Sequence, residues 1–564
     1  MPQLRLQRLL AAIIASIPVA ALAAGPAADL IVEHARIWTV DAARPEADAL
    51  AVLDGRIVAV GTDAEIEVWR GARTRFVDAG GRRVVPGFND AHVHFSDGGA
   101  ALAAVQLNDA TSASELARRV GAYAAGISAG QWILHGNWDE TKWTPAEMPT
   151  RQLLDAVTPN NPVAIERYDG HMVLANSRAL ALAGITARTA DPPGGVIVRD
   201  AHGEPTGALK DAAEELMYAA IPPPSRDERR HAIERALREA AALGVTSVQD
   251  MANPPVDYGD IAVLSSLQVA GKLTTRVYVA PLITGVDDQA KLGIGRAFGG
   301  PWLRIGAVKG YADGSLGSRT AYFFEPFIDQ PDNRGLLGET MQPLSRMREY
   351  LARADAANLQ VCIHAIGDAA ISTVLDLYAE VEKRGTRERR WRVEHAQHMA
   401  AKDFDRFAAL HVIASVQPYH AIDDGRWAEG RIGHDRASRT YAFRTFRDHG
   451  VRLAFGTDWP VAPLNPMDTL YAATTRATLD GRNPGGWFPE QRLSIEEAIE
   501  AYTLGSAYAE FQEHDKGSIT PGKLADFVML SDDILRMPAT DLRRVRVLKT
   551  WVGGVEVYSA PAGP

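Results

Sequence analysis

The feature that most restricts the fold of this chain is an alternation of short apolar strand segments with helical segments, from residue 84 to about residue 510. Such alternation is typical of βαβ units that build a parallel sheet. Eight strand candidates with intervening helices predict an α/β fold of the (β/α)8 TIM-like barrel type, with active groups at the carboxyl ends of the strands. The candidates are residues 84–94, 245–250, 275–282, 303–313, 359–364, 391–395, 412–417 and 452–458.

The helical segments between these strands include residues 226–243, 344–357 and 371–383. The first two strand candidates are separated by about 150 residues, far more than an ordinary βα connection. We therefore expect residues 105–225 to form an inserted subdomain that covers the mouth of a barrel domain spanning 85–510. Strand-like stretches in the insertion are residues 132–139, 163–168 and 195–198, with a helix candidate at 177–183.

Both ends of the chain show short segments rich in Val, Ile and Thr, separated by turns. Asp54-Gly55 and Gly553-Gly554 are dipeptides that favour two-residue β-hairpin turns. We expect residues 24–84 and 511–564 to combine into one small β-sandwich domain. The strand-like segments at the two ends are residues 29–40, 49–60, 74–77, 524–530 and 545–557.

The first residues carry an export signal rather than part of the fold. Arg5 and Arg8 precede an apolar run over residues 9–22, and Ala21-Leu22-Ala23 matches a signal-peptidase site. A retained membrane anchor is the weaker interpretation, because the run is short and contains a proline. Residues 1–23 are thus predicted to be a signal peptide, and the mature protein to be secreted, in the periplasm.

The charge of the chain constrains its partners. The formal net charge is −10 over 564 residues, so the chain lacks the excess of positive charge that favours binding to nucleic acid or anionic lipid. We therefore expect a small-molecule substrate, no nucleic acid and no membrane partner after signal cleavage, and leave a homodimer open. The only cysteine is Cys362, so an internal disulfide is excluded.

Metal-ligating residue types end several of the predicted strands. His92 and His94 are two residues apart in a strand, so both imidazoles project to one face. His364, His395 and Asp458 each lie at the end of a later apolar strand candidate. Four imidazoles and a carboxylate suit a divalent ion, with Zn²⁺ the favoured candidate. Each residue taken singly also fits a core or capping role, but five such residues at matching strand ends favour a metal site.

These segments resemble a known family. Residues 86–94, PGFNDAHVH, are similar to the first-strand signature of the amidohydrolase superfamily. Later strings resemble its YtcJ-like branch, amidohydrolase family 3, which includes N-substituted formamide deformylases. The likeness runs from about residue 30 to about residue 557 and includes RYDGH at 167–171 in the insertion. The later strings are KGYADGS at 309–315, HAIGD at 364–368, VEHAQ at 393–397 and GTDWP at 456–460.

The resemblance implies a role for each matching position. His92, His94 and Asp458 would bind the more buried metal, and His364 and His395 a second one, giving one or two ions per chain. Lys309 would be a carboxylated (carbamylated) lysine that bridges the ions, because a carbamate offers two oxygens and an ammonium offers none. An ordinary ion pair between Lys309 and the nearby Asp313 is the alternative.

A metal site of this kind predicts hydrolysis. A bound ion lowers the pKa of water to about 7, supplying hydroxide at neutral pH, and polarises a carbonyl. Asp458 would take a proton from that water and pass it to a leaving amine. The predicted reaction is hydrolysis of a C–N bond in an amide, formamide or N-acyl compound. Alternatives are a deaminase or cyclic-amide hydrolase, which the presence of Lys309 disfavours, and an inactive binding protein, which the complete ligand set disfavours.

Four residues are predicted to face the substrate. His171, in the insertion, is a catalytic candidate that would cover the metals and hydrogen-bond the carbonyl oxygen; a satisfied loop histidine is the alternative. Gln417 and His420 follow the seventh strand candidate and are expected to line the pocket. Arg319 is a candidate for binding a substrate carboxylate, with a structural ion pair as the alternative.

Overall fold

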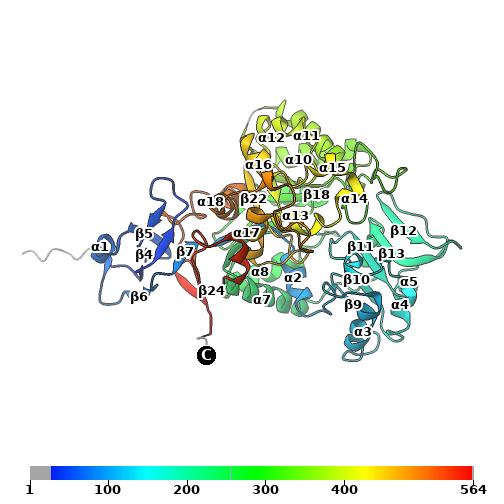
Figure 1. Ribbon diagram of the computed structural model, residues 1–564, viewed down its shortest axis with the longest axis horizontal. Coiled ribbons are helices and arrows are strands. Elements are labelled where there is room, and N and C mark those ends of the chain that lie inside the picture. The colour runs from blue at the N-terminus through cyan, green and yellow to red at the C-terminus, as the bar shows by residue number, and fades with distance from the viewer. Residues whose placement is uncertain (1–26, 255, 297, 386, 562–564) are drawn as a thin grey trace, which may run out of the picture.

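A computed structural model describes residues 27–254, 256–296, 298–385 and 387–561 of the chain (Figure 1). The predicted signal peptide, residues 1–23, lies outside the described residues. Within the described ranges, none of the helices combines the length and the apolar character needed to cross a membrane.

Ten strands in the middle of the chain form two five-stranded sheets. Neighbouring strands run parallel except at one edge. Parallel bridges from Val93 to Trp459 and from Leu282 to Lys309 connect one sheet to the other. In order, the first sheet contains β16 (Phe298–Gly299), β17 (Leu303–Ile305), β15 (Arg276–Ala280), β14 (Val245–Met251) and β8 (Phe88–Val93). The second contains β18 (Ala307–Tyr311), β19 (Gln360–Ala365), β20 (Arg392–His395), β21 (Ile413–Val416) and β22 (Leu453–Phe455).

Two of the eight predicted strands are divided in the structure. The first is interrupted at Gly87, so that its beginning, β7 (Arg83–Pro86), belongs to a different sheet from β8. A Cβ atom at Gly87 would lie 2.1 Å from the hydroxyl of Thr246, so only glycine lets the chain pass β14 this closely. The fourth predicted strand is divided at Gly306 into β17 and β18, which lie in separate sheets.

Helices cover the outside of these sheets, as Figure 1 shows for α7, α8, α10 and α11. The predicted helices are present: α7 (Arg226–Ala242), α10 (Leu344–Ala356) and α11 (Asp368–Glu382), with α8 (Gly259–Val269) in addition. A capping box of Ser225 and Glu228 starts α7. Its buried residues recur with helical spacing, and four of them belong to the apolar core shared with the sheet, namely Ile233, Ala236, Leu237 and Ala240.

The insertion forms a separate lobe, at the right of Figure 1, around its own five-stranded sheet. Two of its strands, β11 (Met172–Ala175) and β13 (Pro205–Asp211), were not expected from the sequence. The other strands are β12 (Gly195–Arg199), β10 (Val163–Glu166) and β9 (Ile133–Leu134). The helices are α3 (Ala113–Ala124), α4 (Arg151–Asp155), α5 (Ser177–Leu182) and α6 (Glu214–Tyr218).

Both ends of the chain contribute to a third unit, at the left of Figure 1. Its two sheets share a buried core that includes Leu30, Val52, Phe527 and Trp551. The first sheet has the order β5 (Arg56–Gly61), β4 (Ala49–Leu53), β1 (Leu30–Glu33) and β6 (Arg75–Asp78). The second has the order β25 (Val555–Ser559), β24 (Val547–Val552), β23 (Phe527–Leu530), β7, β2 (Arg36–Trp38) and β3 (Glu46–Ala47).

Both hairpin turns that the sequence predicts in this unit are present in the structure. Asp54 and Gly55 both have positive φ, at 49° and 73°, and join β4 to β5. Gly553 and Gly554, at 57° and 72°, join β24 to β25 in the same way. The segment 29–40 is two strands rather than one, because His34 adopts a φ of 52° between β1 and β2.

Candidate metal centre

Three of the predicted ligands converge directly. His92, His395 and Asp458 each offer one ligand atom, and these atoms lie within 4.8 Å of one another. Asp458 Oδ1 lies 3.4 Å from His92 Nε2 and 3.1 Å from His94 Nε2. One carboxylate oxygen is therefore shared between two imidazoles, although the residues come from opposite ends of the barrel segment.

His92 on β8 and His94 just after it each use their second ring nitrogen in a hydrogen bond. His92 Nδ1 lies 2.6 Å from Glu394 Oε2, and His94 Nδ1 lies 2.7 Å from the carbonyl oxygen of Met251. When Nδ1 donates to these acceptors, Nε2 keeps its lone pair and is directed toward Asp458. Metal-binding histidines are usually fixed in this way by a carboxylate or a backbone carbonyl. The donor set thus fits a divalent cation.

The other predicted ligands lie against this group. The ring centroid of His395 is 4.8 Å from that of His92 and 4.6 Å from that of His364. Lys309 Nζ is 3.3 Å from His92 Nε2, and its side chain is buried. The structure therefore brings all six predicted ligand residues into one cluster.

The environment favours the metal-binding protonation states of His92, His364, His395 and Asp458. Burial, together with the nearby Lys309, lowers the pKa of His92 to about 4. Burial also lowers the pKa of His364, and burial and the proximity of His364 lower that of His395. Burial also lowers the pKa of His94, but the hydrogen bond to Asp458 and its charge outweigh this, and the net shift is upward. Burial raises the pKa of Asp458, but the adjacent His92, His94 and His395 together outweigh this and hold it well below its usual range. Neutral imidazoles and an ionised carboxylate are the forms that bind metal ions.

Two ligand residues have left-handed backbone conformations. His395 has a φ of 71° and is followed by Ala396 at 43°, while Asp458 has a φ of 62°. Such values are uncommon outside glycine and are concentrated at functional sites. At the end of β20 the turn departs from strand alternation, so that both Glu394 and His395 reach the cluster.

Lys309 does not form the alternative ion pair with Asp313. Among the described residues, the carboxylate of Asp313 accepts backbone N–H groups of Ile366, Gly367 and Tyr322 at 2.8–3.0 Å. Burial lowers the pKa of Lys309 to about 8. The uncharged amine, which is the form that reacts with CO₂, is therefore more populated near neutral pH than in an ordinary lysine.

His171, which belongs to the insertion, lies next to the ligand cluster. Its ring centroid lies 5.0 Å from that of His364. Its Nδ1 lies 2.8 Å from Asp211 Oδ1, so the ring orientation is fixed by a residue of β13. Burial lowers the pKa of His171, but the hydrogen bond to Asp211 and the negative charges of Asp211, Asp169 and Asp313 together outweigh it, and the net shift is upward.

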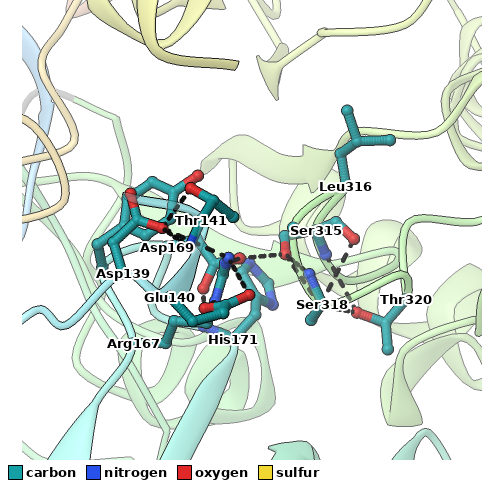
Figure 2. Close-up of polar contacts among 12 residues, drawn as sticks. Asp139, Glu140, Thr141, Arg167, Asp169, His171, Ser315, Leu316, Ser318 and Thr320 are labelled. Carbon is teal, nitrogen blue, oxygen red and sulfur yellow. Dashed lines mark hydrogen bonds and ion pairs between the residues drawn. The ribbon is translucent and has the colours of Figure 1, made fainter. Parts of the chain in front are cut away.

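A polar network attaches the insertion to the loop that follows β18, as Figure 2 shows. Arg167 is fully buried and donates to both oxygens of Glu140, at 2.8 and 3.0 Å, and to Asp169 at 2.7 Å. The hydroxyl of Ser315 in turn donates to Asp169 at 2.7 Å. A Cβ at Gly317 would lie 2.3 Å from Asp169 Oδ2, so the loop contacts the network without room for a side chain.

The predicted substrate-facing residues have different surroundings. Gln417 Oε1 accepts a hydrogen bond from His395 Nδ1 at 2.8 Å. His420 is stacked on His395 at 6.5 Å, and its buried Nε2 has no hydrogen-bond partner in the described part of the chain. Arg319 donates to Asp329 at 2.6 and 3.0 Å, the structural ion pair considered above. The guanidinium of Arg319 is therefore already paired, and its contact with a substrate carboxylate stays a prediction.

Sequence reasoning missed the residues that support the ligands. Glu394, Asp211 and the carbonyl group of Met251 hold the rings of His92, His171 and His94. Glu394 carried a signal, since it directly precedes His395. Strand alternation, however, assigns it to the opposite face. Nothing in the sequence marks Asp211 or Met251, because their partners are distant along the chain.

Replacement of Glu394 with Gln should reduce metal affinity by about 10- to 100-fold. Glutamine still accepts a hydrogen bond from His92, but the negative charge is lost and the buried Arg392, 2.7 Å from Glu394, loses its counter-ion. Competition with a chromogenic chelator measures the affinity. Glu510→Gln is a matched control that breaks a buried pair with Lys516 instead. Equal affinity in Glu394→Gln and the wild type would contradict this role.

A family model described as the amidohydrolase family matches residues 75–558. The chain belongs to the amidohydrolase family. Protein LONG AFTER FAR-RED 3 of Arabidopsis thaliana is 39% identical over 95% of this chain and 92% of that protein. Putative amidohydrolase YtcJ of Bacillus subtilis is 30% identical, over 93% and 98%. N-substituted formamide deformylase of Arthrobacter pascens is 29% identical, over 94% and 98%.

Solved structures agree with the family assignment. An uncharacterized metal-dependent hydrolase from Pyrococcus horikoshii aligns with a TM-score of 0.74 and 29% identity, covering 91% of this chain and 99% of that one. The predicted resemblance to the YtcJ-like amidohydrolases is confirmed. This amidohydrolase is accordingly a hydrolase with an α/β, TIM-barrel-like fold.

Proposed function

We propose that this amidohydrolase cleaves the C–N bond of a small linear amide, formamide or N-acyl compound. The observation that carries the proposal is the position of Asp458 Oδ1, within 3.4 Å of the Nε2 atoms of His92 and His94. A carboxylate there serves both as a ligand and as a base next to the reacting water. The similarity to N-substituted formamide deformylase supports an amide-type substrate.

The remaining features of the centre are part of the same proposal. We propose a barrel that closes through the Val93–Trp459 and Leu282–Lys309 bridges, with Zn²⁺ as the metal and a carboxylated Lys309 between two ions. The signal-like residues 1–23 support a mature protein in the periplasm.

The residues of the chain would divide the chemistry among them. A divalent ion bound by these ligands would polarise the substrate carbonyl and lower the pKa of water to about 7. Asp458 would accept a proton from that water at a carboxylate oxygen and then deliver it to the leaving nitrogen. An amine is a poor leaving group until it is protonated, so this transfer is required for C–N cleavage.

His171 would act on the carbonyl oxygen. Because its Nδ1–H donates to Asp211, Nε2 carries a proton only when the ring is an imidazolium. The upward-shifted pKa of His171 keeps that form populated above pH 6.5. A charged donor beside the carbonyl oxygen would stabilise the negative charge that develops there.

This assignment predicts a pH dependence. The pKa of His171 in the folded protein is raised, so the protonated form is present at low pH and is lost as the pH rises through that pKa. The alkaline limb of kcat/KM should lie above pH 6.5 and should move to lower pH in Asp211→Asn, which keeps the hydrogen bond but removes the charge. A profile that is the same in wild type and variant would argue against the role of His171.

The proposed function is tested by metal analysis and a substrate panel on the mature protein. We expect about two metal ions per chain after purification without chelators and with bicarbonate. The panel compares linear N-formyl and N-acyl amides with cyclic amides and with amino-heterocycles that release ammonia. Turnover of the linear amides alone supports the proposal. Turnover of only the cyclic amides or the amino-heterocycles would replace the proposal with a cyclic-amide hydrolase or a deaminase. One metal ion or fewer per chain, with no turnover of any substrate, would replace it with an inactive binding protein.

A further inference from the structure

The composite β unit contains a polar cavity that is separate from the metal centre. Its volume is about 270 Å³, and its walls come from β2, β3, β7, the turn at Gly61 and Thr62, and residue 536. Four arginines line it, while only two carboxylates do. The arginines are Arg36, Arg44, Arg83 and Arg536, and the carboxylates are those of Glu46 and Asp48.

Arg83 is the buried member of this set. Its side chain is only 1% exposed, yet it lies in the wall of the cavity. Nε and Nη2 donate to Asp533 at 2.8 and 2.9 Å. Nη1 has no hydrogen-bond partner among the described residues, and the nearest carboxylate oxygen, of Glu46, is 3.6 Å away. A buried guanidinium N–H without an acceptor is costly, so a ligand that supplies one is favoured.

Two carboxylates next to the cavity, those of Asp533 and Glu65, are already hydrogen-bonded to its arginines. Asp533 Oδ1 also accepts the backbone N–H of Leu535, and Oδ2 also accepts from Arg36 at 3.3 Å. Arg44 donates to Glu65 at 2.9 Å. Because each guanidinium has five N–H donors, the four arginines retain more donors than these carboxylates can accept.

The other three arginines stand at the rim. The side chains of Arg36, Arg44 and Arg536 are 50%, 48% and 63% exposed, so their remaining donors are accessible to a diffusing ligand. The whole chain has a net charge of −10, so this cluster is not part of a generally basic surface. The buried free donor of Arg83, with three further guanidinium groups around it, is therefore a specific feature of this unit.

We propose that this cavity binds a small multivalent oxyanion, with Arg83 Nη1 as the buried donor and the rim arginines as a clamp. Guanidinium groups recognise phosphate and carboxylate oxygens through paired N–H donors, so the ligand carries a phosphate group or several carboxylates. The site is in a different sheet from the metal ligands, and its occupation does not depend on the reaction proposed above.

Isothermal titration calorimetry on the full mature protein tests the proposal, with inorganic phosphate and citrate as separate probes. NaCl at matched ionic strength removes the effect of general screening. The variants are Arg44→Gln and Arg536→Gln, which change half-exposed side chains and leave the buried pair of Arg83 with Asp533 intact. Arg73→Gln is the control, since it removes the same charge from an exposed position outside the cavity lining.

We expect saturable binding of one anion per chain that weakens about five- to tenfold in each rim variant and is unchanged in Arg73→Gln. Binding of phosphate alone assigns a phosphate ligand, and binding of citrate alone a polycarboxylate. The proposal is overturned if neither anion binds saturably below about 10 mM. It is also overturned if binding is equal in wild type and rim variants, which would place the anion at the metal centre, or if Arg73→Gln weakens it equally.

Discussion

Replacing Asp458 with Asn is expected to reduce turnover by about 10³-fold while the protein stays folded and keeps most of its metal. Asparagine has the same shape and can still offer one oxygen to the centre. It cannot take a proton from water, so the proposed base and acid function is lost. Asparagine also tolerates the left-handed conformation at this position, where φ is 62°. Steady-state kinetics with elemental analysis of the same samples measures both effects.

The matched control for this prediction is Asp468→Asn. Asp468 is a buried carboxylate on the helix Pro466–Thr475, and it pairs with Arg543 at 2.6 Å, away from the histidine cluster. Its replacement should change turnover by less than about threefold. Near-wild-type turnover of Asp458→Asn, with metal bound, would remove Asp458 from the proton-transfer role. A loss of metal equal to the loss of turnover would reduce it to a ligand.

Replacing Lys309 with Arg should lower the metal content from about two ions per chain to about one, with turnover reduced by at least about 100-fold. The neutral amine of Lys309, with its pKa lowered by burial to about 8, can add CO₂. Its nitrogen bonds to the carbon and releases one proton, leaving a carbamate with two ligand oxygens. Arginine keeps the positive charge but stays protonated, so it forms no carbamate.

Bicarbonate dependence separates this effect from a simple packing defect. Wild-type protein depleted of CO₂ and reconstituted with metal should regain activity only when bicarbonate is added, whereas Lys309→Arg should not respond. Lys516→Arg is the control, because Lys516 is also buried but pairs with Glu510 at 2.7 Å outside the cluster. Full metal content in Lys309→Arg, or a wild type indifferent to bicarbonate, would exclude the bridging carbamate.

Several parts of the fold followed from local sequence patterns. The hairpins at Asp54-Gly55 and Gly553-Gly554 form as expected, since their turns require positive φ that glycine and aspartate adopt easily. The predicted helix over 226–243 matches α7 within one residue, with a capping box at its start. These features depend on neighbours only a few residues away, so local chemistry is sufficient to specify them.

Other parts did not follow from local patterns. Continuous apolar character predicted one strand over 84–94, but tertiary pairing divides it at Gly87 between two sheets. The strands β11 and β13 were missed because their pairing partners lie elsewhere in the insertion. The limits of the insertion, 105–225, and of the end segments, 24–84 and 511–564, stay predictions.

The sequence by itself determined which residue types would meet at the centre. His92, His94, His364, His395 and Asp458 stand at or just beyond the ends of apolar strands, and parallel strands bring their carboxyl ends to one edge. Their convergence therefore follows from the strand pattern once a parallel sheet is inferred, whereas the place of Lys309 beside them is implied by the family resemblance.

Only the tertiary structure decided how those groups are held and charged. Glu394, Met251 and Asp211 orient three of the histidines through contacts between distant segments, and the left-handed turn at His395 overrides strand alternation. Burial then sets the protonation states, lowering the pKa of Lys309 to about 8. Hydrogen-bond partners and desolvation are properties of the packed chain, whereas the choice of ligand residues is a property of the sequence.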